Sequence, residues 1–203
     1  MSLIPSHGYD ITFIDEKTVA ITSGDSWEET GIDIIDIENQ SKIEFISLPN
    51  CPYGITRDGE SLLVCVAEHG IYKVNTLNYT KSLVIRRPLE IFSYVSVFTD
   101  KIYYTHRECV VCCDRDGSRV WTFSNFSILK YLSGISADND GNVYVVGKDS
   151  SNMVIISNDG KHHKEILTKG DGLCEPTAIF FDKQNMKLLV ANSNDVAFLY
   201  NVK

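Results

Sequence analysis

The stretch from Gly134 to Gly160 places the strongest constraint on what this chain can fold into. It reads GISADNDGNVYVVGKDSSNMVIISNDG, three short runs rich in β-branched and aromatic residues. DNDG (138–141) and KDSSN (148–152) separate these runs, and NDG (158–160) closes the last one. Short apolar runs bounded by Asn, Asp, Ser and Gly are typical of strands joined by tight turns. The stretch therefore predicts three consecutive antiparallel strands.

The same pattern occurs five times along the chain. The second residues of the five predicted first strands are spaced 44, 41, 39 and 44 residues apart. Fourth strands follow in the first four copies, and they read IEFISL, KSLVIR, RVWTFS and HKEILT. A repeated unit of about 40 to 45 residues with four strands is the signature of β-propeller blades. The five first strands read DITFID, GITRDG, VSVFTD, GISADN and AIFFDK.

A polar residue closes each predicted third strand, and in four copies an Asn or Gly follows three positions later. Asn and Gly tolerate a positive φ, so the second column predicts the left-handed residue of a tight turn into the fourth strand. The polar residues are Asp36, Asn75, Asp114, Ser157 and Asn201, and the predicted left-handed residues are Asn39, Asn78, Gly117 and Gly160.

We therefore predict an all-β fold, a β-propeller of four-stranded antiparallel blades in a single domain over residues 1–203. The blades are expected at residues 9–48, 53–87, 94–124, 133–168 and 177–203. The fifth blade is partial, because no fourth strand follows VAFLYNVK. Residues 2–5 resemble the tail of a fourth strand that could complete this blade. A five-bladed ring and a truncated six-bladed ring both stay open as interpretations.

Composition and charge limit the cellular location and the classes of partner that we expect for this protein. A net charge of −8 and a pI near 5.1 argue against a nucleic-acid partner held by bulk electrostatics. The N-terminus lacks the pattern of a signal peptide, and no apolar run approaches the ~18 residues that span a bilayer. We therefore expect a cytoplasmic protein without a membrane partner. Cys109 and Cys112 form a C-x-x-C in a predicted strand, where residues three apart face opposite ways and cannot share a metal.

The opening unit resembles the NHL repeat, through Gly134, Ile135, Asp138, Gly141 and the run NVYVV. Residues 7–202 also resemble the C-terminal propeller of the tripartite-motif (TRIM-NHL)-like proteins abundant in molluscs, through VAITSG, YGIT, KIYYT, VVCCD, WTF and KLLVAN. This resemblance implies a module that selects protein partners or substrates, linked to ubiquitin-ligase pathways through the family. Such propellers usually have six blades and follow RING, B-box and coiled-coil regions. None of these regions is found in this sequence, so it does not itself carry ligase activity.

Candidate binding residues fall on the loops that join second to third strands and on those that join successive blades. In a propeller these two sets of loops open on one face, and loops on a rigid scaffold usually carry binding. Trp27 is the most conspicuous aromatic, although it could equally fold back over its own blade. The recurrence of tyrosine before three first strands favours a packing role. The candidates are Tyr9, Trp27, Glu28, Tyr53, Glu68, Tyr94, His106, Arg107, Lys148 and Asn192.

Three functions compete, and the charge of these loops ranks them. The first set of loops holds seven acidic and two basic residues, and the second holds three and two. A face this acidic repels a phosphate backbone, so we rank protein binding first and the RNA binding of some NHL propellers second. A calcium-dependent lactonase or esterase ranks third, since Asp10, Glu68, Asn192 and Asp195 do not recur from blade to blade. We predict no catalytic residues, no cofactor and no metal, and therefore no enzyme.

Overall fold

The computed structural model describes residues 8–24 and 29–202, which form nineteen β-strands and one short 3-10 helix (Lys169–Asp171). In this part of the chain the strands form five antiparallel sheets, four with four strands and one with three. Strands that are consecutive in sequence are also neighbours in each sheet. The predicted all-β fold, with four complete blades and a fifth partial one, is confirmed.

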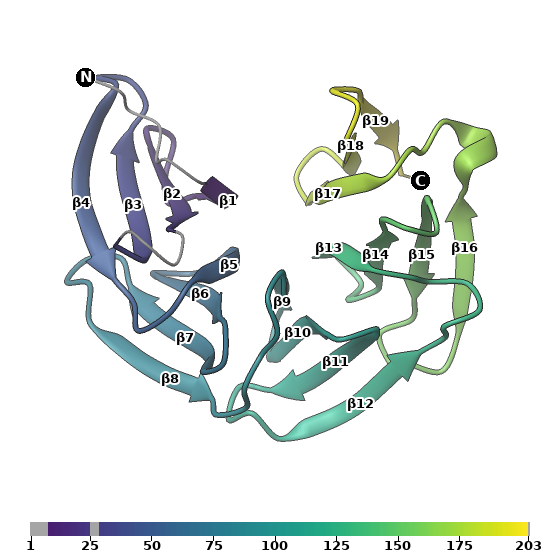
Figure 1. Cartoon of the computed structure of the whole chain (residues 1–203), viewed down its shortest axis with the longest axis horizontal. Coiled ribbons are helices and arrows are strands. Elements are labelled where there is room, and N and C mark those ends of the chain that lie inside the picture. Colours follow the sequence, from purple (N-terminus) through teal and green to yellow (C-terminus); the bar gives the residue numbers. More distant parts are fainter. Residues whose placement is uncertain (1–7, 25–28, 203) are drawn as a thin grey trace. The chain divides into compact units, whose positions relative to one another are not determined.

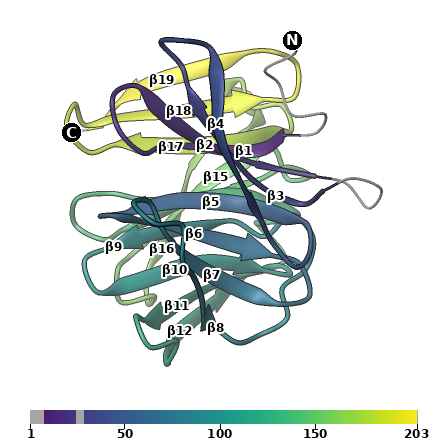
Figure 2. The same cartoon turned by 90° about the vertical axis from the view of Figure 1, so that its left-hand side faces the viewer.

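The chain divides into two compact units between Ser93 and Tyr94. The first unit holds two blades. Blade 1 consists of β1 (Gly8–Phe13), β2 (Thr18–Ser23), β3 (Gly31–Asp36) and β4 (Ser41–Ser47). Blade 2 consists of β5 (Pro52–Asp58), β6 (Ser61–Val66), β7 (Gly70–Asn75) and β8 (Lys81–Ile85), whose strands lie side by side in this order (Figure 2).

The second unit holds three blades. Blade 3 consists of β9 (Val95–Phe98), β10 (Lys101–His106), β11 (Cys109–Asp114) and β12 (Arg119–Ser124). Blade 4 consists of β13 (Leu132–Ala137), β14 (Val143–Gly147), β15 (Asn152–Ile156) and β16 (His163–Leu167). Blade 5 consists of β17 (Pro176–Asp182), β18 (Lys187–Asn192) and β19 (Ala197–Asn201). Residues 2–5, the predicted tail of a fourth strand, lie outside the described residues, so ring closure and the single domain stay predictions.

The core of the first unit lies between its two blades. Ala20, Ile32 and Ile34 of blade 1 pack against a set from blade 2 that includes Leu62 and Val64. All six residues of β6 are buried, as expected for a strand covered on both faces. Full burial of a Leu, Ile or Val side chain contributes about 1.5–3 kcal/mol, so this interface supplies much of the stability of the unit.

Strand β14 organises the core of the second unit, because its alternate residues point to opposite neighbours. Val143 and Val145 join a cluster that includes Tyr103 of blade 3. Tyr144 and Val146 join a different cluster with blade 5, where Tyr144 stacks on Phe181 at 5.6 Å between ring centroids. In Figure 1 the first strands β9, β13 and β17 of this unit lie closer together than the outer strands β12 and β16. Blade 4 is therefore packed on both faces.

Side-chain oxygens on the first strands hold neighbouring blades together. In the first unit Asp10 Oδ2 accepts a hydrogen bond from the backbone N–H of Ile55 at 2.9 Å. In the second unit Ser96 Oγ accepts from Ala137 N at 3.0 Å, and Ser136 Oγ accepts from Phe181 N at 3.0 Å. Each of these three bonds pairs a side-chain acceptor of one blade with a backbone donor of the next blade in the same unit.

The predicted turn column is correct in blades 3 and 4 and wrong by one residue in blades 1 and 2. Gly117 and Gly160 have the expected positive φ, of 87° and 73°. In the first two blades the left-handed residues are Gln40 and Tyr79, not Asn39 and Asn78. The side-chain oxygens of Asp36 and Asn75 accept from the backbone N–H groups of Asn39 and Asn78, and this bond holds those residues within the turn. The chain then reverses one residue later.

Candidate functional site

The loops between second and third strands and the loops between blades form the loop face, and within each unit they contact one another. In the first unit Glu68 N donates to the Leu89 carbonyl at 2.8 Å. In the second unit Lys148 N donates to the Tyr131 carbonyl at 2.8 Å, and Glu175 N donates to Ser151 Oγ at 3.1 Å. Each of these bonds joins one set of loops to the other. The two sets therefore share one face in each unit.

The loop face has a recurring backbone feature. Seven of its loops each hold one non-glycine residue with φ between 45° and 62°. The left-handed conformation costs an ordinary residue roughly 1–2 kcal/mol, so each loop is held in it by its surroundings. The side chains of this face therefore project from well-defined backbone positions. The seven residues are Glu68, Phe92, Arg107, Tyr131, Ser151, Glu175 and Asp195.

Three aromatic rings pack together on the first unit. The centroid of the Tyr53 ring lies 4.7 Å from that of Tyr9 and 5.0 Å from that of Phe92. Tyr53 is buried and the other two are half-buried. Aromatic pairs at these distances contribute about 0.5–1.5 kcal/mol beyond the area they bury. The rings of Tyr9 and Tyr53 therefore pack against each other and against Phe92. This is the packing role that the recurrence of tyrosine in the sequence favours.

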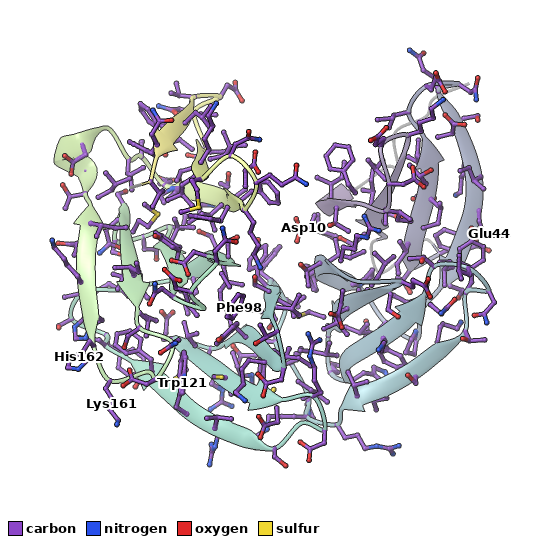
Figure 3. All side chains as sticks on the ribbon, turned by 180° about the vertical axis from the view of Figure 1, so that it is seen from behind. Asp10, Glu44, Phe98, Trp121, Lys161 and His162 are labelled. Carbon is purple, nitrogen blue, oxygen red and sulfur yellow. The ribbon has the colours of Figure 1, made fainter. Side chains whose placement is uncertain are left out.

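Asp10 follows Tyr9 in the first strand β1 (Figure 3). Its backbone N–H donates to Thr22 Oγ1, and that hydroxyl donates to the Tyr53 carbonyl at 2.6 Å. Burial raises the pKa of the Asp10 carboxyl to about 6, although N–H donors from Ile55 and Ile11 oppose the shift. Burial and the charge of Asp10 also raise the pKa of the buried Cys65 thiol. We therefore expect the protonation of Asp10 to change at about pH 6.

Tyr131 is the centre of the loop face on the second unit. Its side chain is 41% exposed, yet three groups fix the residue in place. Its backbone N–H donates to Glu108 Oε2 at 2.8 Å, and its carbonyl accepts from Lys148 N. The Lys148 ammonium also lies 5.9 Å from the centroid of the ring, within range of a cation–π interaction. An exposed aromatic ring is thus held by loops from two blades.

A second layer supports this arrangement. Lys130 N donates to Ser150 Oγ at 3.1 Å, and the same hydroxyl donates to the Oδ1 atom of the buried Asn152 at 2.7 Å. These contacts join the loop between blades 3 and 4 to the loop between β14 and β15. We refer to Glu108, Lys130, Tyr131, Lys148 and Ser150 as the Tyr131 cluster.

Solved structures that align with this chain identify the fold. A chain in a structure of the nidogen/laminin complex aligns with a TM-score of 0.72 and 16% identity, over 86% of this chain and 72% of its own length. A streptogramin B lyase structure aligns with a TM-score of 0.69 and 15% identity, over 98% of this chain and 70% of its own length. This chain has the β-propeller fold. At these identities the likeness concerns the fold alone, not the activity. No protein-family model and no curated protein sequence matches the chain.

The propeller places the sequence-predicted residues in different surroundings. Lys148 belongs to the Tyr131 cluster, and Arg107 is exposed beside the half-buried His106. Glu68 is exposed in the first unit, where its Oε2 accepts from Asn50 Nδ2 at 3.3 Å. Trp27 and Glu28 lie outside the described residues, and binding by any of these candidates stays a prediction.

Two other candidates of the second unit are largely built into the scaffold. Tyr94 is half-buried against the core between blades 3 and 4, and its N–H donates to Thr105 Oγ1 at 2.8 Å. Asn192 is buried and donates from Nδ2 to the Gly172 carbonyl at 3.0 Å, while its Oδ1 has no hydrogen-bond partner in the described part of the chain. Both residues can therefore support the loops that a ligand would touch.

Residues 8–24 and 29–202 contain no group of three His, Cys, Asp or Glu side chains able to hold a metal ion. None of the described segments is a helix long and apolar enough to cross a bilayer. Sequence reasoning missed Tyr131 itself, although it lies in a loop already assigned to the candidate face. The available signal was an aromatic residue next to a lysine in NFSILKYLS.

Proposed function

We propose that this propeller is a non-catalytic protein-binding module and that the Tyr131 cluster contacts the partner. The observation that carries the proposal is the combination of exposure and order at Tyr131. Its ring is accessible, while its amide, its carbonyl and the face of its ring each have a partner. Tyrosine is enriched among the residues that dominate protein interfaces, and a residue that is already ordered loses less entropy on binding.

The partner is expected to be a protein that a tripartite-motif-like protein selects. The repeat motifs that resemble NHL blades support this assignment. The Tyr131 cluster also lies on loops, which carry binding residues more often than the strands of a rigid scaffold do. The comparison with a chain from the nidogen/laminin complex accords with protein binding by a propeller of this kind. Fold alone does not fix function, so the argument depends on the Tyr131 cluster.

The test compares two alanine variants of the full chain. Tyr131→Ala removes the proposed anchor, and Leu77→Ala removes a side chain that is 74% exposed in the turn between β7 and β8, outside the loop face. Proteins captured from a cell extract by each variant are quantified by mass spectrometry. A central anchor contributes about 2 kcal/mol or more to binding. We therefore expect Tyr131→Ala to capture at least tenfold less of each specific partner than the wild-type chain, and Leu77→Ala to capture the same amount.

Equal capture by both variants would place the partner elsewhere and overturn the role of Tyr131. Recovery of RNA in place of protein, with binding that weakens steeply as salt increases, would support the RNA-binding alternative. Thermal unfolding of each variant provides the folding control, because Tyr131 is largely outside the buried clusters.

A further inference from the structure

We propose that the partner presents an aspartate or glutamate side chain to Lys148, so that the loop face of the second unit binds an acidic protein segment. The carboxylate pairs with the Lys148 ammonium beside the Tyr131 ring. This inference rests on the proposed function, because it gives the chemistry of the partner that the Tyr131 cluster contacts.

The first observation is that the Lys148 ammonium lies over the ring that the partner covers. Its nitrogen is 5.9 Å from the centroid of the Tyr131 ring. The backbone N–H of Lys148 donates to the Tyr131 carbonyl at 2.8 Å, so both ends of the lysine contact Tyr131. A partner that buries the ring therefore also removes water from this ammonium.

The second observation is that the Lys148 ammonium has no hydrogen-bond acceptor among the residues that the structure describes. A lysine ammonium carries three N–H donors, and here they are left to the solvent. Burial of a charged group without a partner strongly opposes binding. The partner must therefore bring an acceptor. A carboxylate makes the strongest bond of this kind, because both groups are then charged.

The acidic side chains of the neighbouring loops do not supply this acceptor. Glu108 Oε2 accepts from the Tyr131 N–H at 2.8 Å, and that bond helps to hold the ring in place. Asp149 follows Lys148 in sequence and is exposed, but within residues 8–24 and 29–202 it forms no ion pair with Lys148. The positive charge of Lys148 is therefore available to a partner.

Lys130 adds a second positive charge beside Tyr131. Its backbone N–H donates to Ser150 Oγ at 3.1 Å, while its side chain is exposed. Like Lys148, it forms no ion pair in the described part of the chain. The Tyr131 cluster thus holds two ammonium groups and one carboxylate, although the whole chain has a net charge of −8. This local excess of positive charge complements an acidic segment.

The charges around the cluster favour a protein segment over a nucleic acid. Asp149 is exposed beside Lys148, and the exposed Glu175 donates its N–H to Ser151 Oγ on the same loop as Lys148. A nucleic acid carries a negative charge on every nucleotide, so its successive phosphates would meet these carboxylates. A protein segment can place one carboxylate at Lys148 and uncharged residues elsewhere. An acidic protein segment therefore fits the site better.

The first test uses a library of random-sequence peptides as the probe. Peptides are selected on the full wild-type chain, and those that also bind Tyr131→Ala are discarded, so that the remaining peptides depend on Tyr131. We expect these peptides to be enriched in Asp and Glu. Selection on Lys148→Glu should reverse the preference toward Lys and Arg, because like charges across an interface repel each other.

Lys161→Glu is the matched control. It changes the net charge of the chain by the same amount as Lys148→Glu. Lys161 lies between β15 and β16, outside the loop face, with a side chain that is 77% exposed. This variant should keep the wild-type preference for acidic peptides. Thermal unfolding of both variants provides the folding control.

A second measurement quantifies the contact with one selected peptide. Dissociation constants are measured for the wild-type chain and for Lys148→Met, which keeps an apolar stem but removes the ammonium. Each protein is tested with the selected peptide and with a version in which Asn and Gln replace Asp and Glu. We expect Lys148→Met to weaken binding of the acidic peptide at least about tenfold, and binding of the amide version much less.

The outcomes separate this inference from the proposed function. If no selected peptide depends on Tyr131, the proposed role of Tyr131 fails, and this inference fails with it. Tyr131-dependent peptides without an excess of Asp and Glu, or with a preference that Lys148→Glu leaves unchanged, would overturn the carboxylate contact alone. Tighter Tyr131-dependent binding of a single-stranded RNA oligonucleotide than of the acidic peptides would also overturn it.

Discussion

Replacement of Gly70 by alanine is expected to destabilise the first unit by about 4 kcal/mol or more, a large part of the roughly 5–15 kcal/mol by which ordinary domains are stable. Gly70 begins β7 with φ at 136°, a conformation that L side chains rarely adopt. A β-carbon at this position would also overlap the backbone carbonyl oxygen of Ile85 in β8. Ile85 ends the outermost strand β8, and its backbone cannot move aside without breaking the pairing between β7 and β8.

Gly59→Ala is the matched control. Gly59 also has a positive φ, of 60°, but no atom lies within 4 Å of the position that its β-carbon would take. This variant therefore carries only the conformational cost of about 1 kcal/mol. In a chain of this length, 1 kcal/mol shifts the melting temperature by roughly 2–4 °C, so we expect a loss of about 10 °C or more for Gly70→Ala. Similar melting temperatures for the two variants would contradict the close approach of β8 to Gly70.

The stability of the protein is expected to fall as pH rises from about 4 to about 6, through the titration of Asp10. Its pKa is raised from 3.8 to about 6, chiefly by burial. Between these values the folded protein holds a proton that the unfolded chain has released, so the free energy of unfolding decreases with increasing pH. A shift of this size corresponds to about 3 kcal/mol of stability, which is fully present below the unfolded pKa of 3.8 and fully lost at a pH well above about 6.

Asp10→Asn isolates this contribution. The amide oxygen can still accept from the Ile55 N–H, but it does not titrate. The free energy of unfolding of both proteins is measured with urea from pH 4 to 7. The difference between the two free energies should change by about 2–3 kcal/mol across this range. Carboxyls whose pKa is lowered, such as those of Asp36 and Asp182, titrate below this window and are present in both proteins. A difference that stays constant with pH would show that Asp10 is solvated in the folded protein.

The blades could be predicted from the sequence because their signals are local and repeated. The apolar run SLLVCV predicts a strand covered on both faces, and every residue of β6 is buried. The turns at Gly117 and Gly160 are also local, since glycine alone favours a positive φ there. The prediction was wrong at Asn39 because the carboxylate of Asp36, three residues earlier, holds that residue within the turn. The residue types in the turn do not predict which backbone N–H group such a carboxylate will bind.

The candidate site could be predicted only as a set of loops. Tyr131 owes its position to Glu108 and Lys148, which lie 23 residues before it and 17 after it, on two other loops. No periodicity in the sequence brings these residues together, because only the stacking of blades 3 and 4 does so. Tyr9 and Tyr53 illustrate the opposite case. The sequence predicts them just before first strands and the structure places them inside β1 and β5, but their regular recurrence already favours the packing that the structure shows.

The sheets of this protein contain only strands that are consecutive in sequence, and this has a consequence for how the chain folds during synthesis. Most of the contacts within a blade span fewer than about 40 residues, so the entropy lost in closing its loops is small and the blade can form quickly. A blade can therefore assemble soon after it leaves the ribosome, before the next blade exists. Its apolar faces remain open until a neighbour arrives, and the order of translation sets the order in which they are covered.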